Sequence, residues 1–108
     1  MARYFRTVGP DDHTLNRNAV TPNKIAQYGC DNLTQFAEYL GIHRTTLARA
    51  YTGSINVGAK LLTAIATKTN MPIGDIIETH PEGTRLYLPG DKGYDPGDWP
   101  EISVRGRT

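Results

Sequence analysis

The sequence predicts a mainly α protein in which residues 21–78 form a compact bundle of five short helices and both ends of the chain add short extensions. Three observations lead to this fold class. Apolar residues recur at helical spacing between residues 22 and 77, which favours amphipathic helices. Glycines follow two of these segments, at Gly41 and Gly53, where helices commonly end. Turns of only a few residues separate the segments, and five helices joined so closely pack as a bundle.

The first two helices are predicted from their start and stop residues. Thr21 followed by Pro22 provides a cap and a proline at the first helical position, and Gly29 ends this segment. Asn32 with Gln35 three residues later resembles a capping box, with Asn in place of Ser or Thr. A second helix is therefore expected over about residues 33–40.

The remaining helices follow from a turn glycine and from apolar spacing. Gly41 supplies a left-handed residue for a sharp turn, so a third helix is expected from about Arg44 to the residue before Gly53. A fourth segment, about residues 58–69, has a predicted inward face made by Leu62, Ile65, Ala66 and Thr69. A short fifth helix is expected at about residues 72–77. The second and third helices then form a helix-turn-helix.

The two extensions have the pattern of strands and turns. Residues 3–8 alternate before a Gly-Pro turn, so the segment 1–20 is expected to contain a strand and little helix. In the segment 79–108, residues 85–88 and 102–104 are strand-like and are separated by Pro-Gly turns. Together these runs can form a small sheet. The aromatic residues Tyr87, Tyr94 and Trp99 give the C-terminal segment apolar surface that it can bury on folding. Two roles stay open for this sheet, dimerisation or a loose extension.

Charge is segregated along the chain although the formal net charge is only +1. No Asp or Glu lies between Glu38 and Asp75, whereas acidic residues dominate from Asp75 to residue 101. The cations in the acid-free stretch are Arg44, Arg49, Lys60 and Lys68. This stretch should therefore present a positive face, as nucleic-acid-binding domains do.

Several other function classes find no support in the sequence. A single cysteine, Cys30, cannot form an internal disulfide, and no apolar run has the length of a membrane span, so a cytoplasmic protein without a membrane partner is expected. The three histidines, His13, His43 and His80, have no metal-ligand spacing with cysteines or carboxylates. We therefore expect no metal, no cofactor and no enzymatic activity.

The central segment, FAEYLGIHRTTLARAYTG at residues 36–53, resembles the helix-turn-helix of the lambda-repressor-like (XRE-type) DNA-binding domains. The resemblance covers about residues 21–78 and implies a compact five-helix lambda-repressor-like bundle. Its turn glycine, core leucine and closing glycine all fall in register. The residues at the characteristic positions of the family are Phe36, Ala37, Gly41, Ile42, Leu47, Gly53, Ile65, Ala66, Ile76 and Ile77.

Some positions depart from the family pattern. Many members pair an Arg in the first helix with a Glu late in the third, but Ala26 and Tyr51 stand there in this chain, so packing must replace the ion pair. The second helix often begins with a Gln that binds a phosphate, and here this residue is Leu33. The phosphate contact is then expected to shift to Asn32, Thr34 or backbone N–H groups.

The third predicted helix has one face that fits the major groove of DNA. Leu47, Ala50 and Tyr51 share the side that packs on the second helix. The opposite side is basic and hydroxylic and carries no acid, with Arg44, Thr45, Ala48, Arg49 and Thr52. Arginine pairs with guanine edges, and Ala and Thr methyl groups can contact thymine methyl groups. We predict that bases are contacted by Arg44, Thr45, Ala48 and Arg49.

Residues around this helix are candidates for contacts with DNA phosphates. His43 stands where the family has a Ser or Thr cap, and both a phosphate contact and a capping role stay open for it. The turn into the fourth helix adds the backbone N–H of Gly58 at a helix N-terminus. The predicted phosphate-binding residues are Asn32, Thr34, His43, Thr46, Ser54, Asn56 and Lys60.

These features together predict a transcriptional regulator, a repressor of phage or prophage type that binds a double-stranded DNA operator as a homodimer. Two copies on a two-fold operator are expected because one recognition helix contacts too few base pairs for a specific site. The predicted dimerisation residues are Ile73, Ile76, Ile77, Leu86 and Leu88. The alternative is an antitoxin-like interaction module whose C-terminal tail neutralises a partner protein.

Overall fold

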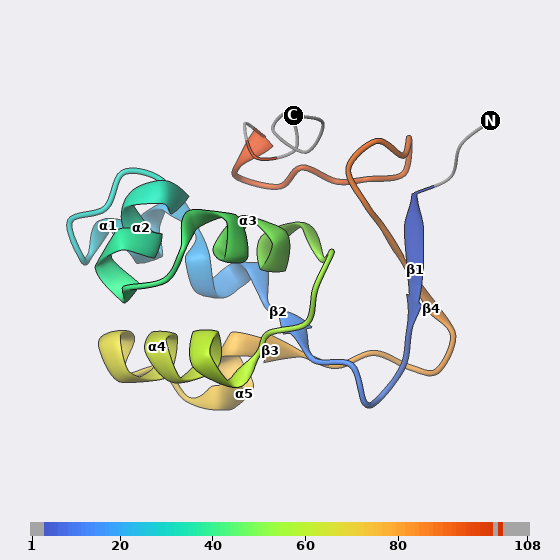
Figure 1. Cartoon of the computed structure of the whole chain (residues 1–108), viewed down its shortest axis with the longest axis horizontal. Helices are drawn as coiled ribbons and strands as arrows, with labels where there is room; N and C mark the ends of the chain where they lie inside the picture. Colours follow the sequence, from blue (N-terminus) through green and yellow to red (C-terminus); the bar gives the residue numbers. More distant parts are fainter. Residues whose placement is uncertain (1–3, 101, 103–108) are drawn as a thin grey trace.

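A computed structural model describes residues 4–100 and 102 of the chain. Five α-helices in this part of the chain form a helical body, and a pair of strands projects at one end of it (Figure 1). The helices are α1 (Pro22–Ala26), α2 (Leu33–Leu40), α3 (Arg44–Thr52), α4 (Ala59–Thr69) and α5 (Ile73–Ile76). None of the helices in the described residues has the length and apolar character needed to cross a membrane.

The ends of the helices confirm the predicted start and stop residues. The Thr21 hydroxyl accepts a hydrogen bond from Lys24 N at the start of α1, and Asn32 Oδ1 accepts one from Gln35 N at 2.8 Å at the start of α2. The reciprocal bond of the predicted capping box is shifted by one residue, because Gln35 Oε1 accepts from Asp31 N at 2.7 Å. The orphan N–H groups at the start of α2 are still partly satisfied.

The inward face of α4 differs from the prediction. Leu61 and Ile65, one turn apart, are its buried residues, whereas Leu62 and Ala66 are only half-buried at its flank. The predicted face was rotated because Leu62, Ile65, Ala66 and Thr69 fit helical spacing as well as the true set does. The packing of α4 against α2 and α5 decides between these two faces.

The N-terminal segment contributes more than the predicted strand and turn. The strand β1 (Phe5–Val8) lies within the predicted residues 3–8, and a short strand β2 (Thr14–Leu15) and a 3-10 helix η1 (Arg17–Val20) follow it. Leu15, Ala19 and Val20 are all buried in the main core. Residues 14–20 are therefore part of the body of the protein and not a peripheral extension.

Two short antiparallel sheets join strands before α1 to strands after α5. The strand β1 pairs with β4 (Thr84–Tyr87), with Phe5 opposite Tyr87, and β2 pairs with β3 (Ile77–Glu78). The predicted strands at residues 3–8 and 85–88 thus form the small sheet that the sequence suggested. The predicted strand at residues 102–104 is not observed at Ile102, which is helical, and residues 103 and 104 lie outside the described part.

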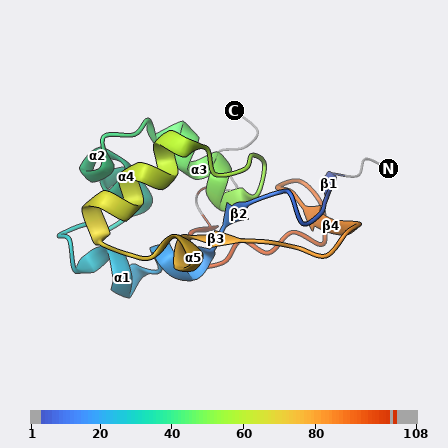
Figure 2. The same cartoon turned by 90° about the horizontal axis from the view of Figure 1, so that it is seen from below.

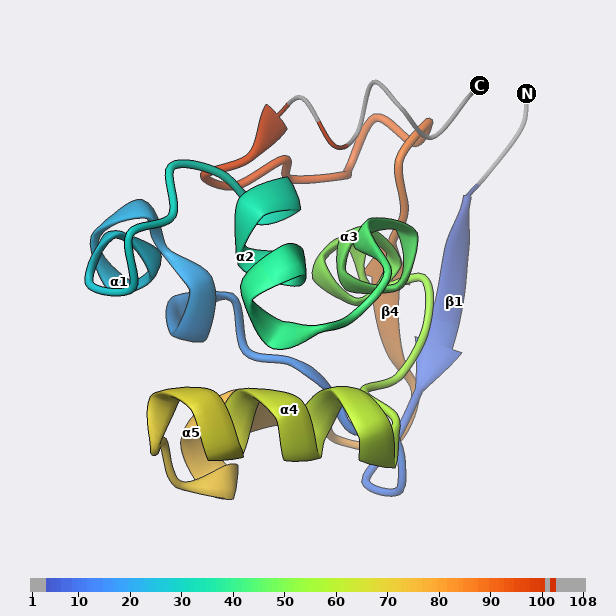
Figure 3. The same ribbon diagram turned by 60° about the vertical axis from the view of Figure 1, so that its left-hand side comes forward.

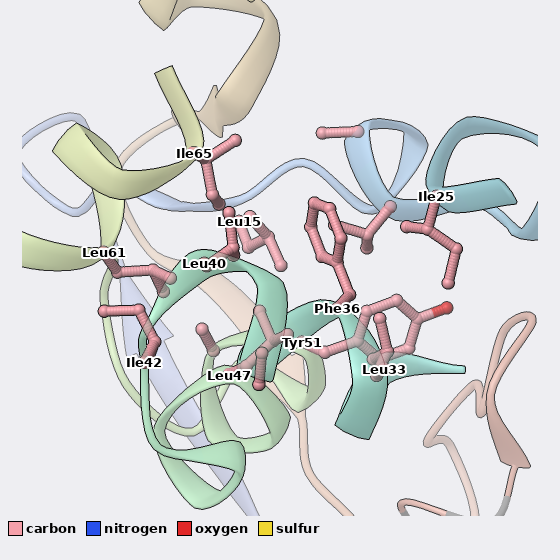
Figure 4. Packing of buried hydrophobic residues seen from close by; sticks show 14 of the residues in the cluster. Leu15, Ile25, Leu33, Phe36, Leu40, Ile42, Leu47, Tyr51, Leu61 and Ile65 are labelled. Atoms are coloured by element: carbon pink, nitrogen blue, oxygen red, sulfur yellow. The ribbon is translucent and has the colours of Figure 1, made fainter. Parts of the chain in front are cut away.

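The core lies between α2, α3 and α4 and extends to η1 and α5 (Figure 4). Phe36, Leu47 and Ile65 are fully buried at its centre, and each comes from a different helix. Tyr51, at the position where the family often has an ion pair, is only 2% exposed. Packing therefore replaces that ion pair, as the sequence predicted.

Residues 94–99 cross the helical body and contact it at two places. The Trp99 ring is buried, and its Nε1 donates a hydrogen bond to the carbonyl of Val20 at 2.8 Å. The Arg17 guanidinium lies over the Tyr51 ring, 4.5 Å from its centroid, and donates to the Asp95 carbonyl and the Tyr94 hydroxyl. These contacts connect η1, α3 and the C-terminal segment.

We predict that Trp99→Ala lowers the free energy of unfolding by about 3 kcal/mol, the usual cost of removing a buried aromatic ring. Urea denaturation followed by far-UV circular dichroism measures this change. The matched control Trp99→Phe keeps most of the apolar volume and should lose less. If Trp99→Ala changes the unfolding free energy by under about 0.5 kcal/mol, as surface substitutions do, the segment does not stabilise the fold.

Candidate nucleic-acid interface

The turn between α2 and α3 is fixed by backbone hydrogen bonds around Gly41. Gly41 has a φ of 74°, a left-handed conformation that glycine adopts without a side-chain penalty. Its N–H closes the end of α2, and Ile42 N donates to the Ala37 carbonyl at 3.0 Å. This paired pattern is a Schellman motif, which satisfies carbonyls at the end of α2 and aims the chain into α3.

His43 caps the start of α3. Its Nδ1 accepts a hydrogen bond from Thr45 N at 3.1 Å, while the side chain itself stays exposed. The sequence left open a phosphate contact or a capping role for His43, and in the structure His43 caps α3. The bond uses an unprotonated Nδ1, so the imidazole acts here as an acceptor in place of the usual Ser or Thr hydroxyl.

The outward face of α3 carries the predicted base-contacting residues. Arg44, Thr45 and Arg49 are exposed, and Ala48 is half-buried against the edge of the core. Figure 3 shows α3 nearly along its axis, between α2 on one side and β1 on the other. The side of α3 away from the core therefore presents two arginines and one threonine, and no residue of α3 is acidic.

Thr52 does not share this face. It is 7% exposed, and its hydroxyl donates to the Arg49 carbonyl at 3.0 Å and lies 2.8 Å from the Ser54 hydroxyl. The predicted outward position was wrong because the Thr52 side chain bonds to the end of its own helix and to Ser54 instead of facing solvent. Gly53, with a φ of 88°, makes the turn that brings Ser54 back to the end of α3.

The loop after α3, residues 53–58, holds two of the predicted phosphate-binding residues, Ser54 and Asn56. Both are half-buried and have partners within the protein. Arg6 on β1 donates from Nη1 to the Ser54 carbonyl at 3.1 Å and from Nη2 to Asn56 Oδ1. Asn56 Nδ2 in turn donates to Asp12 Oδ1 at 3.1 Å. The polar groups of these two residues are thus largely used inside the molecule.

Arg6 and Asp12 are residues of this site that the sequence analysis did not identify. Both residues precede their partners in the loop by 44 to 50 positions in the chain, so no local sequence pattern connects them. An arginine at the middle of a short alternating strand gives no signal of its own. Only the pairing of β1 with β4 places Arg6 beside the loop.

The remaining predicted phosphate-binding residues lie at the starts of helices or on their exposed sides. Asn32 caps α2 and is half-buried, whereas Thr34 in its first turn is exposed. Thr46 is half-buried on α3. Lys60 is exposed in the first turn of α4, whose cap residue, Gly58, has no side chain to accept from the first N–H groups. A phosphate can take that place.

The predicted dimerisation residues do not form one surface. Ile76 is fully buried in the core of its own chain, so it is not available to a second subunit. Ile73 is 54% exposed on α5, whereas Leu86 is half-buried on β4 and its side chain points toward Gly53. Figures 1 and 2 place α5 under the helical body and β4 beyond its end. Ile77, in β3, and Leu88, after β4, are half-buried. The prediction grouped residues that are close in the chain but lie on different elements.

The network around Asp12 has an electrostatic consequence. The hydrogen bond from Asn56, the N–H of Gly9 at 2.9 Å and the nearby Arg6 charge lower the pKa of the Asp12 carboxyl from its ordinary value. These groups stabilise the charged carboxylate in the folded protein. The N-terminal segment is therefore connected to the loop after α3 by an ionised side chain.

Comparison with known proteins identifies the family. The family profile of the Cro/C1-type HTH DNA-binding domain matches residues 23–82, more than half of the chain. The chain therefore belongs to the family of Cro/C1-type helix-turn-helix DNA-binding domains, and it is a DNA-binding protein of the class that regulates transcription. Searches of curated proteins and of solved structures found no match. The matched residues include α2, α3 and α4 but not Arg6 or Asp12.

We predict that Asp12 contributes to stability at neutral pH and that this contribution is lost in acid. Its pKa is lower in the folded than in the unfolded chain, so the contribution is fully present above the unfolded pKa of about 4 and falls as the pH drops through the folded value. Asp12→Asn should therefore unfold at a lower temperature than the wild type at pH 7 and approach it near pH 2. Asp11→Asn is the neighbouring control. Parallel curves of melting temperature against pH for Asp12→Asn and the wild type would contradict this.

Proposed function

We propose that this protein is a sequence-specific transcriptional repressor that binds double-stranded operator DNA through the outward face of α3. The observation that carries the proposal is the exposed, acid-free face formed by Arg44, Thr45 and Arg49. Arg44 and Thr45 lie at the N-terminal end of α3, where recognition helices of this family approach base edges. Ala48 provides an apolar contact at the margin of this face.

Phosphate contacts flank the recognition helix in this proposal. Thr34 and the cap of α2 precede α3 in the chain, and Lys60 with the first N–H groups of α4 follows it. Thr46 and the His43 ring stand between the base contacts and the backbone of the duplex. Such contacts fix the register of the helix in the groove and contribute most of the salt-dependent affinity.

A dimer on a two-fold operator is part of the same proposal. The β1–β4 pair is a two-stranded sheet in the described residues, so each strand has an outer edge that can pair with a second copy. Tyr4 and Tyr87 on this pair are 48% and 40% exposed. This surface therefore replaces the wider region, Ile73 to Leu88, that the sequence suggested. A phage or prophage origin follows only by analogy with lambda-repressor-like proteins.

The antitoxin-like alternative has less support. It requires the C-terminal tail to be available to a partner protein. Within the described residues, Tyr94 and Trp99 contact the helical body of their own chain. In addition, an interaction module that does not bind DNA has no need of Arg44 and Arg49 on an exposed helix face.

We predict that Arg49→Ala weakens binding to the preferred operator by about 1 to 3 kcal/mol and relaxes discrimination at one base pair. The operator is first obtained by selection from random duplexes with the purified protein. Binding of the selected and random duplexes is then compared by fluorescence anisotropy. Lys24→Ala, which removes an exposed charge from α1, is the charge-matched control. Equal losses on both duplexes would show that Arg49 contacts phosphate and not a base.

We predict that Tyr87→Glu shifts the protein toward monomer and weakens operator binding, because a charge at the sheet opposes edge pairing. Analytical ultracentrifugation measures the shift, which should exceed about 1 kcal/mol in dimerisation free energy. Ile73→Glu places the same charge at an exposed apolar position on α5 and should leave the dimer intact. The opposite ranking of the two variants would move the interface to α5, and a monomeric wild type at tens of micromolar would remove the dimer.

A further inference from the structure

The loop after α3, residues 53–58, is attached to the N-terminal segment by three residues of that segment. Arg6 bonds to Ser54 and Asn56, Asp12 bonds to Asn56, and the His13 carbonyl accepts from Val57 N at 2.8 Å. Two further bonds, Ser54 N to the Arg49 carbonyl and the Thr52–Ser54 hydroxyl pair, connect the loop to α3. The loop path between the recognition helix and α4 is thereby fixed from both sides.

Arg6 is central to this attachment because its guanidinium serves two acceptors in the loop at once. Its side chain is 24% exposed and lies on the face of β1 that is turned toward the loop. Asp12 stands 3.8 Å from the same guanidinium and offsets its charge. The planar fork of an arginine can reach a carbonyl and an amide oxygen together, whereas the single ammonium of lysine cannot reproduce that geometry.

We propose that Arg6 is a positioning residue for DNA binding, which fixes the loop so that Lys60 and the first N–H groups of α4 face the phosphate backbone. This inference rests on the proposed function of the α3 face. Arg6 is expected to act through the loop and not by contacting DNA itself, because its N–H groups already donate to Ser54 and Asn56. Lys60 is the second residue of α4 and follows Gly58 by only two positions, so the direction of the loop determines where its charge lies.

Two substitutions at Arg6 separate positioning from a direct charge contact. Arg6→Lys keeps the charge and loses the fork, whereas Arg6→Ala loses both. If Arg6 positions the loop, both variants should weaken binding about tenfold, the cost of lost charge-assisted hydrogen bonds. The loss should be similar on selected and random duplexes, since phosphate contacts carry no sequence information. Lys24→Ala is the control for a change in net charge.

The salt dependence of binding and amide hydrogen exchange provide independent readouts. If Lys60 loses its phosphate contact when the loop is no longer fixed, the slope of log K against log salt should fall by about one in Arg6→Lys, as in Lys60→Ala, although Arg6→Lys keeps its own charge. In the free protein, the Val57 amide should exchange faster in both Arg6 variants because its bond to His13 depends on the fixed loop. Thermal unfolding confirms that each variant is folded before it is compared.

Wild-type affinity in Arg6→Lys, together with a reduced salt slope in Arg6→Ala, would overturn the proposal and make Arg6 a direct phosphate contact. Wild-type affinity in both variants would also overturn it. These results differ from a failure of the proposed function, in which the wild-type protein selects no duplex or Arg49→Ala retains full discrimination. Exchange of the Val57 amide still tests the positioning role in that case, because it is measured without DNA.

Discussion

The side chain of Tyr51 connects α3 to η1 and to the C-terminal segment that contains Asp98. Its ring is buried in the core, the Arg17 guanidinium lies over it, and its hydroxyl accepts a hydrogen bond from Asp98 N at 3.0 Å. Burial raises the pKa of this hydroxyl, so it remains protonated at neutral pH. An ion pair at this position would join only two helices of the bundle. The tyrosine joins η1, α3 and the C-terminal segment, while the opposite face of α3 stays exposed.

The sequence predicted the elements whose signals are local. The caps at Thr21 and Asn32, the turn at Gly41 and the end of α3 at Gly53 lie within a few residues of the structure they determine, and each was located correctly. The exposed arginines of α3 were also predicted, because the apolar residues of a helix define its outer face by spacing alone. Their assignment to DNA bases stays a prediction. The same residues also indicated that the chain is a member of the helix-turn-helix family, and the family comparison confirms this.

The parts that the sequence did not predict depend on distant contacts. Thr52 was placed outward because its spacing fits that face, but it is buried and its hydroxyl contacts Arg49 and Ser54. Ile76 was assigned to a dimer surface, although it completes the core beneath η1 and α5. Arg6, Asp12 and Arg17 have no motif around them, and their roles arise only when β1 pairs with β4 and residues 94–99 return to the helical body. The spacing of residues along the sequence does not indicate which distant segments pair.

The pairing of Phe5 with Tyr87 has a consequence for the order in which the molecule assembles. Closing a loop that runs from residue 5 to residue 87 has a larger entropic cost than joining neighbouring helices, so the helical body is expected to form first and the β1–β4 sheet last. During synthesis, the first strand leaves the ribosome long before its partner exists. Until then, the loop after α3 can meet Arg6 only transiently. The helix α3 would thus be complete before the loop beside it is fixed, and a nascent chain would acquire this surface only after residues 84–87 are synthesised.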